Sequence, residues 1–119
     1  MPKLIKSPSF FPQEEITIAE FFGRISSGET GISICRITSA AGWSEPRQRP
    51  DFDEYTVMIS GSLHLRDETG KTTIVREGEA VFVPRGESVQ YSSPEEPGAD
   101  YIAVCVPAFA MEIANRDAE

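Results

Sequence analysis

Short runs of alternating apolar and polar residues follow one another along the chain, each bounded by turn-forming residues. The runs are rich in β-branched and aromatic side chains, a pattern typical of strands. Regular spacing of such runs predicts an all-β sandwich or barrel. The expected strands are residues 31–39, 53–60, 62–67, 72–76, 79–83, 88–92 and 101–106.

The segments between these runs contain residues that favour turns. Residues 68–71, Glu-Thr-Gly-Lys, predict a hairpin turn, and the prolines and glycines in 41–50 and 93–100 predict loops. Two short segments, 108–115 and 19–22, are compatible with a helix. The chain is therefore expected to contain little helix.

Length and charge narrow the function classes. The 119 residues suit one domain, with a core barrel at about 31–107, flanking strands or an arm at 1–30 and a short tail at 108–119. The net charge of −8 and the lack of a basic run argue against nucleic acid as a partner. The apolar runs are shorter than the roughly 20 residues of a membrane helix, and the first residues lack a signal-peptide pattern. We expect a cytoplasmic protein without a membrane partner.

The two cysteines have apolar neighbours and do not form a CxxC pair. Cys35 follows Ile34, and Cys105 lies between two valines. Buried, reduced thiols are the expected state of such residues.

Two stretches resemble the two-part signature of the cupin superfamily. Gly42, Glu54 and Gly61 match the glycine, glutamate and closing glycine of the first family motif. Gly78, Pro84 and Gly86 match the second motif with its spacing, and the stretch from Glu54 to Phe109 resembles small stand-alone cupins and, more loosely, the ethanolamine-utilisation cupin family. The resemblance implies an RmlC-like antiparallel β-barrel or jelly-roll sandwich that encloses a substrate-sized pocket.

The positions that hold metal-binding histidines in the family differ in this sequence. Gln48, Pro50 and Val89 occupy these three positions, and Glu54 remains. Gln90, the next residue, would serve as a metal ligand in place of Val89 only if a β-bulge turned its side chain inward. We therefore expect no tightly bound transition metal, because imidazoles are the ligands that suit such metals. A weak divalent ion on Glu54, Asp53 and Gln90 stays open as an alternative.

Strand alternation places Glu54, Thr56 and Met58 on the same face of one predicted strand. If this face lines the barrel, burial raises the pKa of Glu54 and makes it a candidate general acid or base. Two alternatives remain: Glu54 pairs with Arg47 or Arg49 and fixes a loop, or it is a solvated charge at a strand edge.

Further polar side chains are candidate ligand contacts. Arg47 and Arg49 have the geometry to hold an anion by bidentate hydrogen bonds, or they belong to a solvated loop. For the aromatic and amide candidates, packing within the barrel is the alternative to ligand contact. Trp43 either caps the pocket or packs at the rim, and His64 is expected at the surface or in an interface. The candidate ligand-binding residues are Gln48, Arg47, Arg49, Gln90, Tyr91 and Met58.

Two function hypotheses follow from these residues. The first is a binding or sensing module for a small polar metabolite such as a sugar or an organic acid. The second is an isomerase, epimerase or lyase that uses Glu54 as acid or base, or a weakly held metal. A nucleophilic hydrolase is disfavoured because the sequence lacks a nucleophile elbow and a phosphate-binding loop. A homodimer is expected, with N-terminal residues at its interface.

Overall fold

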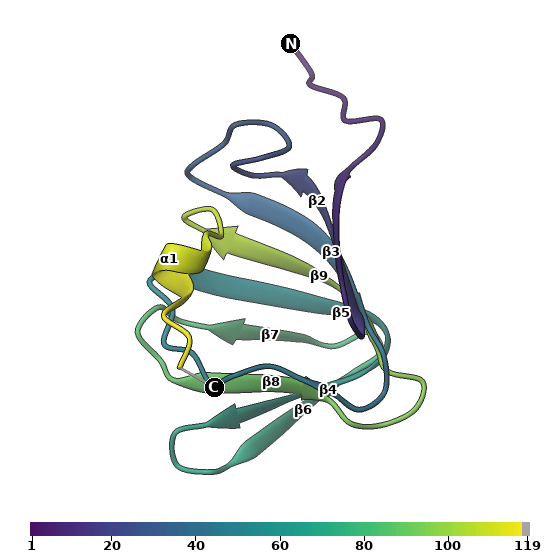
Figure 1. Ribbon diagram of the computed structural model, residues 1–119, viewed down its shortest axis with the longest axis vertical. Coiled ribbons are helices and arrows are strands. Elements are labelled where there is room, and N and C mark those ends of the chain that lie inside the picture. Colours follow the sequence, from purple (N-terminus) through teal and green to yellow (C-terminus); the bar gives the residue numbers. More distant parts are fainter. Residues whose placement is uncertain (118–119) are drawn as a thin grey trace.

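Most of the chain forms antiparallel strands in two sheets that are joined through one long strand (Figure 1). The computed structural model describes residues 1–117. The helix α1 (Met111–Ala114) follows the last strand. The strands are β1 (Ser9–Gln13), β2 (Ile16–Phe22), β3 (Ser33–Ser39), β4 (Trp43–Ser44), β5 (Asp53–Asp67), β6 (Thr72–Arg76), β7 (Ala80–Val83), β8 (Val89–Ser93) and β9 (Ala99–Val106).

The long strand β5 belongs to both sheets. Its first half pairs with β7 and β9, and the first sheet continues from β9 through β3 and β2 to β1. Its second half pairs with β6 and β8, and β4 extends this second sheet. The β5–β9 register shifts between Met58 and Ser60, and Gly61 follows with a φ of 77°. This bulge and glycine allow β5 to bend from one sheet into the other.

The predicted strands are all present, and the differences concern their continuity and ends. Residues 53–60 and 62–67 form one strand because Gly61 bends β5 without ending it. The helix considered at residues 19–22 is wrong, since this segment belongs to β2 and pairs with both β1 and β3. The helix considered at 108–115 is limited to Met111–Ala114.

The core lies between the inner faces of the two sheets. Along β5, the side chains of Thr56 and Met58 are buried, while those of Tyr55, Val57 and Ile59 face outward. This alternation confirms the sequence-based assignment of the two faces. The buried hydrophobic cluster contains Ile16, Trp43, Met58, Leu63, Leu65, Val75, Val83, Val89, Tyr91, Ala99, Tyr101 and Ala103.

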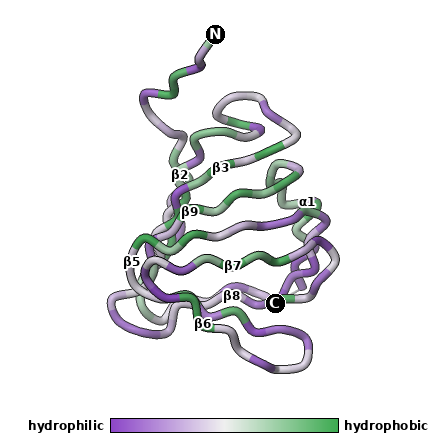
Figure 2. Tube along the Cα trace, turned by 180° about the vertical axis from the view of Figure 1, so that it is seen from behind, coloured by the Kyte–Doolittle hydropathy of each residue, from purple (hydrophilic) through white to green (hydrophobic). Residues whose placement is uncertain are grey.

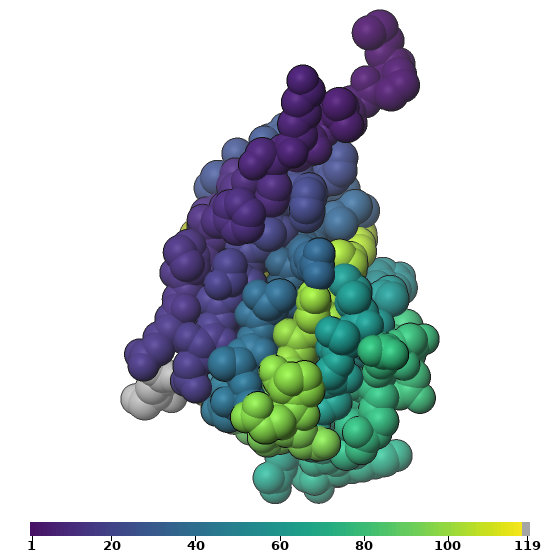
Figure 3. All heavy atoms as spheres, turned by 90° about the vertical axis from the view of Figure 1, so that its right-hand side faces the viewer, coloured from purple at the N-terminus to yellow at the C-terminus, as the bar shows by residue number. Residues whose placement is uncertain are grey.

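The two ends of the described chain behave differently. Residues before β1 extend away from the body of the molecule (Figure 3). The C-terminal segment instead pairs with the loop at 47–51: the amides of Asp51 and Arg49 donate to the carbonyls of Ile113 and Asn115. Within residues 1–117, no helix is long and apolar enough to cross a membrane.

Candidate functional site

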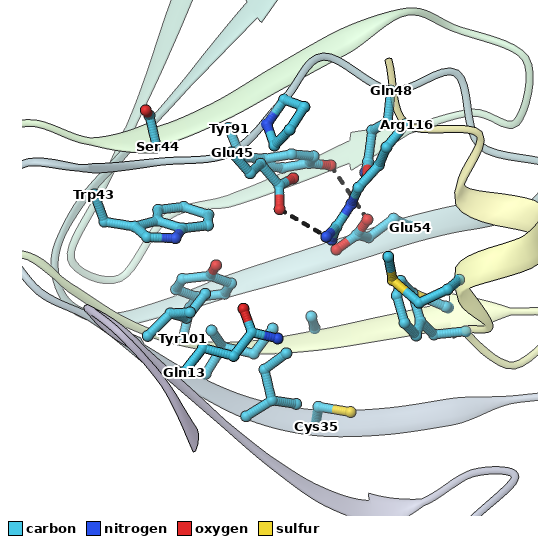
Figure 4. A pocket seen from close by; sticks show the side chains of 18 of the residues that line it. Gln13, Cys35, Trp43, Ser44, Glu45, Gln48, Glu54, Tyr91, Tyr101 and Arg116 are labelled. Carbon is cyan, nitrogen blue, oxygen red and sulfur yellow. Dashed lines mark hydrogen bonds and ion pairs between the residues drawn. The ribbon is translucent and has the colours of Figure 1, made fainter. Parts of the chain in front are cut away.

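A cavity of about 590 Å³ opens between the two sheets. Such a volume lies within the range of sites for small metabolites. Strands β2, β3, β5, β8 and β9, the loop around β4 and the C-terminal segment all contribute to its wall. The polar and aromatic side chains in this wall include Gln13, Trp43, Ser44, Glu45, Gln48, Glu54, Tyr91, Tyr101 and Arg116 (Figure 4).

Glu54 projects from β5 into the cavity. The hydroxyl of Tyr91 on β8 donates a hydrogen bond of 3.3 Å to Glu54 Oε1. Burial raises the pKa of Glu54 to about 7, and the nearby charge of Glu45 contributes in the same direction. A carboxyl group with this pKa exchanges a proton near neutral pH.

A second carboxylate, Glu45, forms an ion pair with Arg116. The distance between Arg116 Nη2 and Glu45 Oε2 is 3.1 Å, and Arg116 Nε donates to Gln48 Oε1, also at 3.1 Å. Burial raises the pKa of Glu45 to about 7, and the charge of Arg116 opposes this rise. The guanidinium carbon lies 6.0 Å from the ring centre of Phe109, which adds a cation–π contact.

This network places Arg116 beside two carboxyl groups from different parts of the chain (Figure 4). Its guanidinium lowers the pKa of both Glu45 and Glu54, whereas burial raises both pKa values and the charge of Glu45 further raises that of Glu54. The site therefore holds a fixed positive charge and two acids that compete for protons near neutral pH.

Two tyrosines and two cysteines also line the cavity. Burial raises the pKa of Tyr91 and Tyr101 well above 10, so both hydroxyls stay protonated and act as neutral hydrogen-bonding groups. Burial also raises the pKa of Cys35 to about 12 and that of Cys105 further. Both thiols are free and buried, as predicted, and their protonation makes them poor nucleophiles.

The two candidate arginines of the loop before β5 lie outside this cavity. Arg47 donates to Ser88 Oγ at 3.0 Å and to the carbonyl of Asp67. Arg49 is exposed and forms a 3.1 Å ion pair with Glu68. Gln48, between them, faces the cavity, because alternate side chains of an extended segment point in opposite directions. Arg116 thus has the place beside the carboxylates that the sequence suggested for Arg47 or Arg49.

The remaining candidate residues differ in whether they line the cavity. Gln90 lies next to Tyr91, and its amide donates to the backbone carbonyl of Glu45 at 3.1 Å, outside the cavity wall. Met58 is buried in the core and is not part of the cavity wall. Trp43 is buried in the core cluster and also lines the cavity. His64 is half-buried, with Nε2 2.7 Å from Glu95 Oε2.

Sequence reasoning missed Arg116, Glu45 and Tyr101. Arg116 lies in the tail, and its approach to the cavity depends on pairing with a loop about 70 residues earlier. Tyr101 had an available signal: in β9 it alternates with Asp100 and Ile102 and so belongs to the inward face.

Comparisons with known proteins place this geometry in a family. Residues 38–95 match the model of the EutQ-like cupin domain. An RmlC-like cupin from Shewanella frigidimarina superposes with a TM-score of 0.71 at 14% identity, covering 89% of each chain. This chain has the RmlC-like cupin fold and resembles the EutQ-like cupins.

Two curated relatives contain a segment similar to this cupin. The endoribonuclease YbeY of Myxococcus xanthus is 38% identical over 100 residues, which cover 84% of this chain and 34% of that protein. The acetate kinase EutQ of Salmonella typhimurium is 34% identical over 53 residues, covering 44% of this chain and 23% of that protein. The cupin thus spans about a third or less of the relatives that it matches.

The residues at the family's metal positions do not fit a transition metal in this cupin. The aliphatic side chains of Pro50 and Val89 offer no donor atom, and Gln48 Oε1 already accepts a hydrogen bond from Arg116. Within residues 1–117, no three His, Cys, Asp or Glu side chains gather in a way that could hold a metal ion. Asp53, considered as a weak ligand, points outward and pairs with Arg85.

Proposed function

We propose that this cupin binds a small polar metabolite in the cavity between its sheets, with Glu54 as the central recognition group. The observation that carries the proposal is the convergence of Glu54, Tyr91 and the Glu45–Arg116 ion pair on one cavity of about 590 Å³. Apolar walls with a few converging polar groups are typical of metabolite sites.

The charges in the cavity favour a ligand rich in hydroxyl groups. With pKa values of about 7, Glu45 and Glu54 together offer both donors and acceptors near neutral pH. Arg116 balances the negative charge that remains. Trp43 supplies an aromatic surface in the same wall, and Gln48 and Tyr91 supply an amide and a hydroxyl. A sugar, a polyol or a hydroxy acid matches this combination.

The second candidate is an enzyme that moves a proton, of the isomerase, epimerase or lyase type. The pKa of Glu54, about 7, favours this alternative because a general acid or base works best when its pKa lies near the working pH. Glu54 would exchange a proton with the ligand, while Tyr91 holds the carboxyl group in position through its hydrogen bond. The chain spans only about a third or less of the relatives that it matches, so the activities named for those relatives do not carry this proposal.

A ligand screen with a matched pair of variants tests the proposal. Sugars, polyols and hydroxy acids are screened by thermal shift, and each hit is measured by calorimetry on Glu54→Gln and on Glu68→Gln. Glu68 is exposed and lies outside the cavity wall, so its variant is the control. We expect a hit to bind the wild type and Glu68→Gln equally, and Glu54→Gln at least tenfold more weakly. Equal affinity for all three proteins would exclude Glu54 from recognition.

The two candidate functions are separated by following ligand protons. Each hit is incubated with the protein in D₂O, and exchange of its C–H protons is measured by NMR. Exchange that requires Glu54 indicates an enzyme, whereas tight binding without exchange indicates a binding or sensing module.

A further inference from the structure

Two neighbours fix the guanidinium of Arg116 at the cavity wall. Gln48, which is buried, accepts a hydrogen bond from Nε at 3.1 Å, and the guanidinium carbon lies over the ring of Phe109. Within the described chain, the other hydrogen bond of this guanidinium runs from Nη2 to Glu45 Oε2. In Figure 4 it points between the carboxyl groups of Glu45 and Glu54. An arginine held in this way presents its donors at little cost in side-chain freedom.

The segment that carries Arg116 is anchored on both sides of this residue. Before it, the apolar helix α1 (Figure 2) packs in a small cluster with Phe52, in which Ala114 is fully buried. After it, the amide of Asp117 donates to the carbonyl of Arg47 at 2.7 Å. The position of the guanidinium therefore comes from the fold and does not depend on a ligand.

Glu45 has a fixed backbone but a carboxyl group attached at one point. Its amide donates to the carbonyl of Tyr91 at 3.2 Å, and its own carbonyl accepts from Gln90 Nε2 at 3.1 Å. Among the described residues, the carboxyl group makes its hydrogen bond with Arg116 alone. The side chain of Glu45 can therefore turn away without any change in the backbone.

The Glu45–Arg116 pair uses only part of the binding capacity of the guanidinium. A guanidinium and a carboxylate bind most strongly through two parallel hydrogen bonds. Arg36 and Asp100 form such a pair at 2.9 and 2.7 Å, whereas Arg116 and Glu45 share one hydrogen bond of 3.1 Å. Burial also opposes the ionisation of Glu45, whose pKa is raised to about 7. Arg116, which is only 25% exposed, thus has a counter-ion that is easily protonated, although a buried charge without a partner is unfavourable.

We propose that Arg116 binds the carboxylate of an organic acid, and that Glu45 takes the place of this carboxylate in the structure. The inference rests on the proposed function and, within it, selects hydroxy acids over neutral sugars and polyols. The ligand would form two hydrogen bonds with the guanidinium while Glu45 turns aside as the neutral acid. A hydroxyl group of the same ligand would meet Glu54, which belongs to the same cavity wall. An amine fits less well, because it would place a second positive charge beside Arg116.

Matched ligands test this preference by calorimetry on the full chain. Lactate, mandelate and gluconate are each compared with the corresponding primary amide, which has nearly the same shape but no charge. Glucamine is the cationic probe. We expect at least one acid to bind at least tenfold more tightly than its amide, and glucamine to bind more weakly than gluconate. Amides that bind as tightly as their acids, or tighter binding of glucamine, would overturn the inference.

Three variants locate the preference at Arg116. Arg116→Gln should bring the affinities for an acid and its amide within threefold of each other, and Arg116→Lys should restore part of the difference. Glu45→Gln should bind the acid at least threefold more tightly than the wild type, because the competing group has lost its charge. The matched controls are Arg49→Gln and Glu68→Gln, since this pair has the same 3.1 Å distance but is exposed and lies outside the cavity wall. Both controls should keep the preference of the wild type.

The outcomes separate this inference from the proposed function. Sugars or polyols that bind through Glu54, with no binding of any acid, would refute the carboxylate site and leave the proposed function in place. A folded Arg116→Gln variant that still prefers the acid would also refute it. If circular dichroism shows that Arg116→Gln is unfolded, Glu45→Gln decides, because a merely structural ion pair gives no reason for tighter acid binding. Absence of binding for every class of ligand would contradict both proposals.

Discussion

Arg116 Nη2 lies 3.1 Å from Glu45 Oε2, although the two residues are 71 positions apart in the chain. The pairing of the C-terminal segment with the loop at 47–51 brings them together. Glu54 belongs to the same cavity wall, so one guanidinium influences the protonation of two carboxyl groups. The acid–base properties of the site therefore depend on a tail residue as well as on the barrel.

Replacing Arg116 by Gln should raise the pKa of Glu45 and Glu54 above their values of about 7. The reason is that the charge of Arg116 lowers both pKa values in the native protein. Carboxyl chemical shifts of ¹³C-labelled glutamate, followed by NMR between pH 4 and 9, measure this change. Arg49→Gln is the control, since Arg49 is exposed and pairs with Glu68. Unchanged titration of both carboxyl groups in Arg116→Gln would contradict the assignment.

Glu54 should make the folded protein less stable as the pH rises from about 4.5 to about 7. Its pKa is raised from 4.5 to about 7 in the folded state, so folding favours the protonated form. This contribution is fully present below pH 4.5 and is lost as the pH passes through 7. In urea titrations at pH 5 and 8, the free energy of unfolding should fall less for Glu54→Gln than for the wild type. An equal fall in the two proteins would argue against a raised pKa.

Gly61 and Gly78 have similar backbone angles but different surroundings. Replacing each by alanine should therefore lower the free energy of unfolding by different amounts. Both have positive φ values, 77° and 80°. A Cβ at Gly61 would clash with the backbone carbonyl oxygen of Gly98, whereas a Cβ at Gly78 meets open space. Gly78→Ala should therefore cost about 1–2 kcal/mol for the left-handed backbone alone. Gly61→Ala should cost roughly 3 kcal/mol or more, because the bend of β5 must also shift. Urea unfolding of the two variants measures the difference, and equal losses would refute the close approach.

The thiol of Cys35 should react slowly although it lines the cavity. Burial raises its pKa from 9.0 to about 12, so the reactive thiolate at pH 8 is about a thousandfold rarer than for an ordinary cysteine. The rate of labelling by a small alkylating reagent should rise by a similar factor when the protein is unfolded in guanidinium chloride. Native and unfolded rates within tenfold of each other would contradict the raised pKa.

The sequence by itself determined the strands, the two faces of β5 and the superfamily. Periodicity of two is a local property, and Gly42, Glu54, Gly61, Gly78 and Pro84 lie at fixed spacings along the chain. Both signals can be read without knowing which strands pair. Alternation placed Glu54 on the same face as Thr56 and Met58, and the structure then showed that this face is the inner one.

The tertiary structure decided which charged groups meet. Arg47, Arg49 and Arg116 are all arginines, so the sequence alone does not tell which one meets a carboxylate. Contacts between segments far apart in the chain place Arg116 beside Glu45. The pKa of Glu54 likewise depends on burial and on charges from other segments, which no local pattern encodes. The apolar outward residues of β5 look like an ordinary buried strand in the sequence. Only the strand pairing and the measured exposure show that no other part of the described chain covers them.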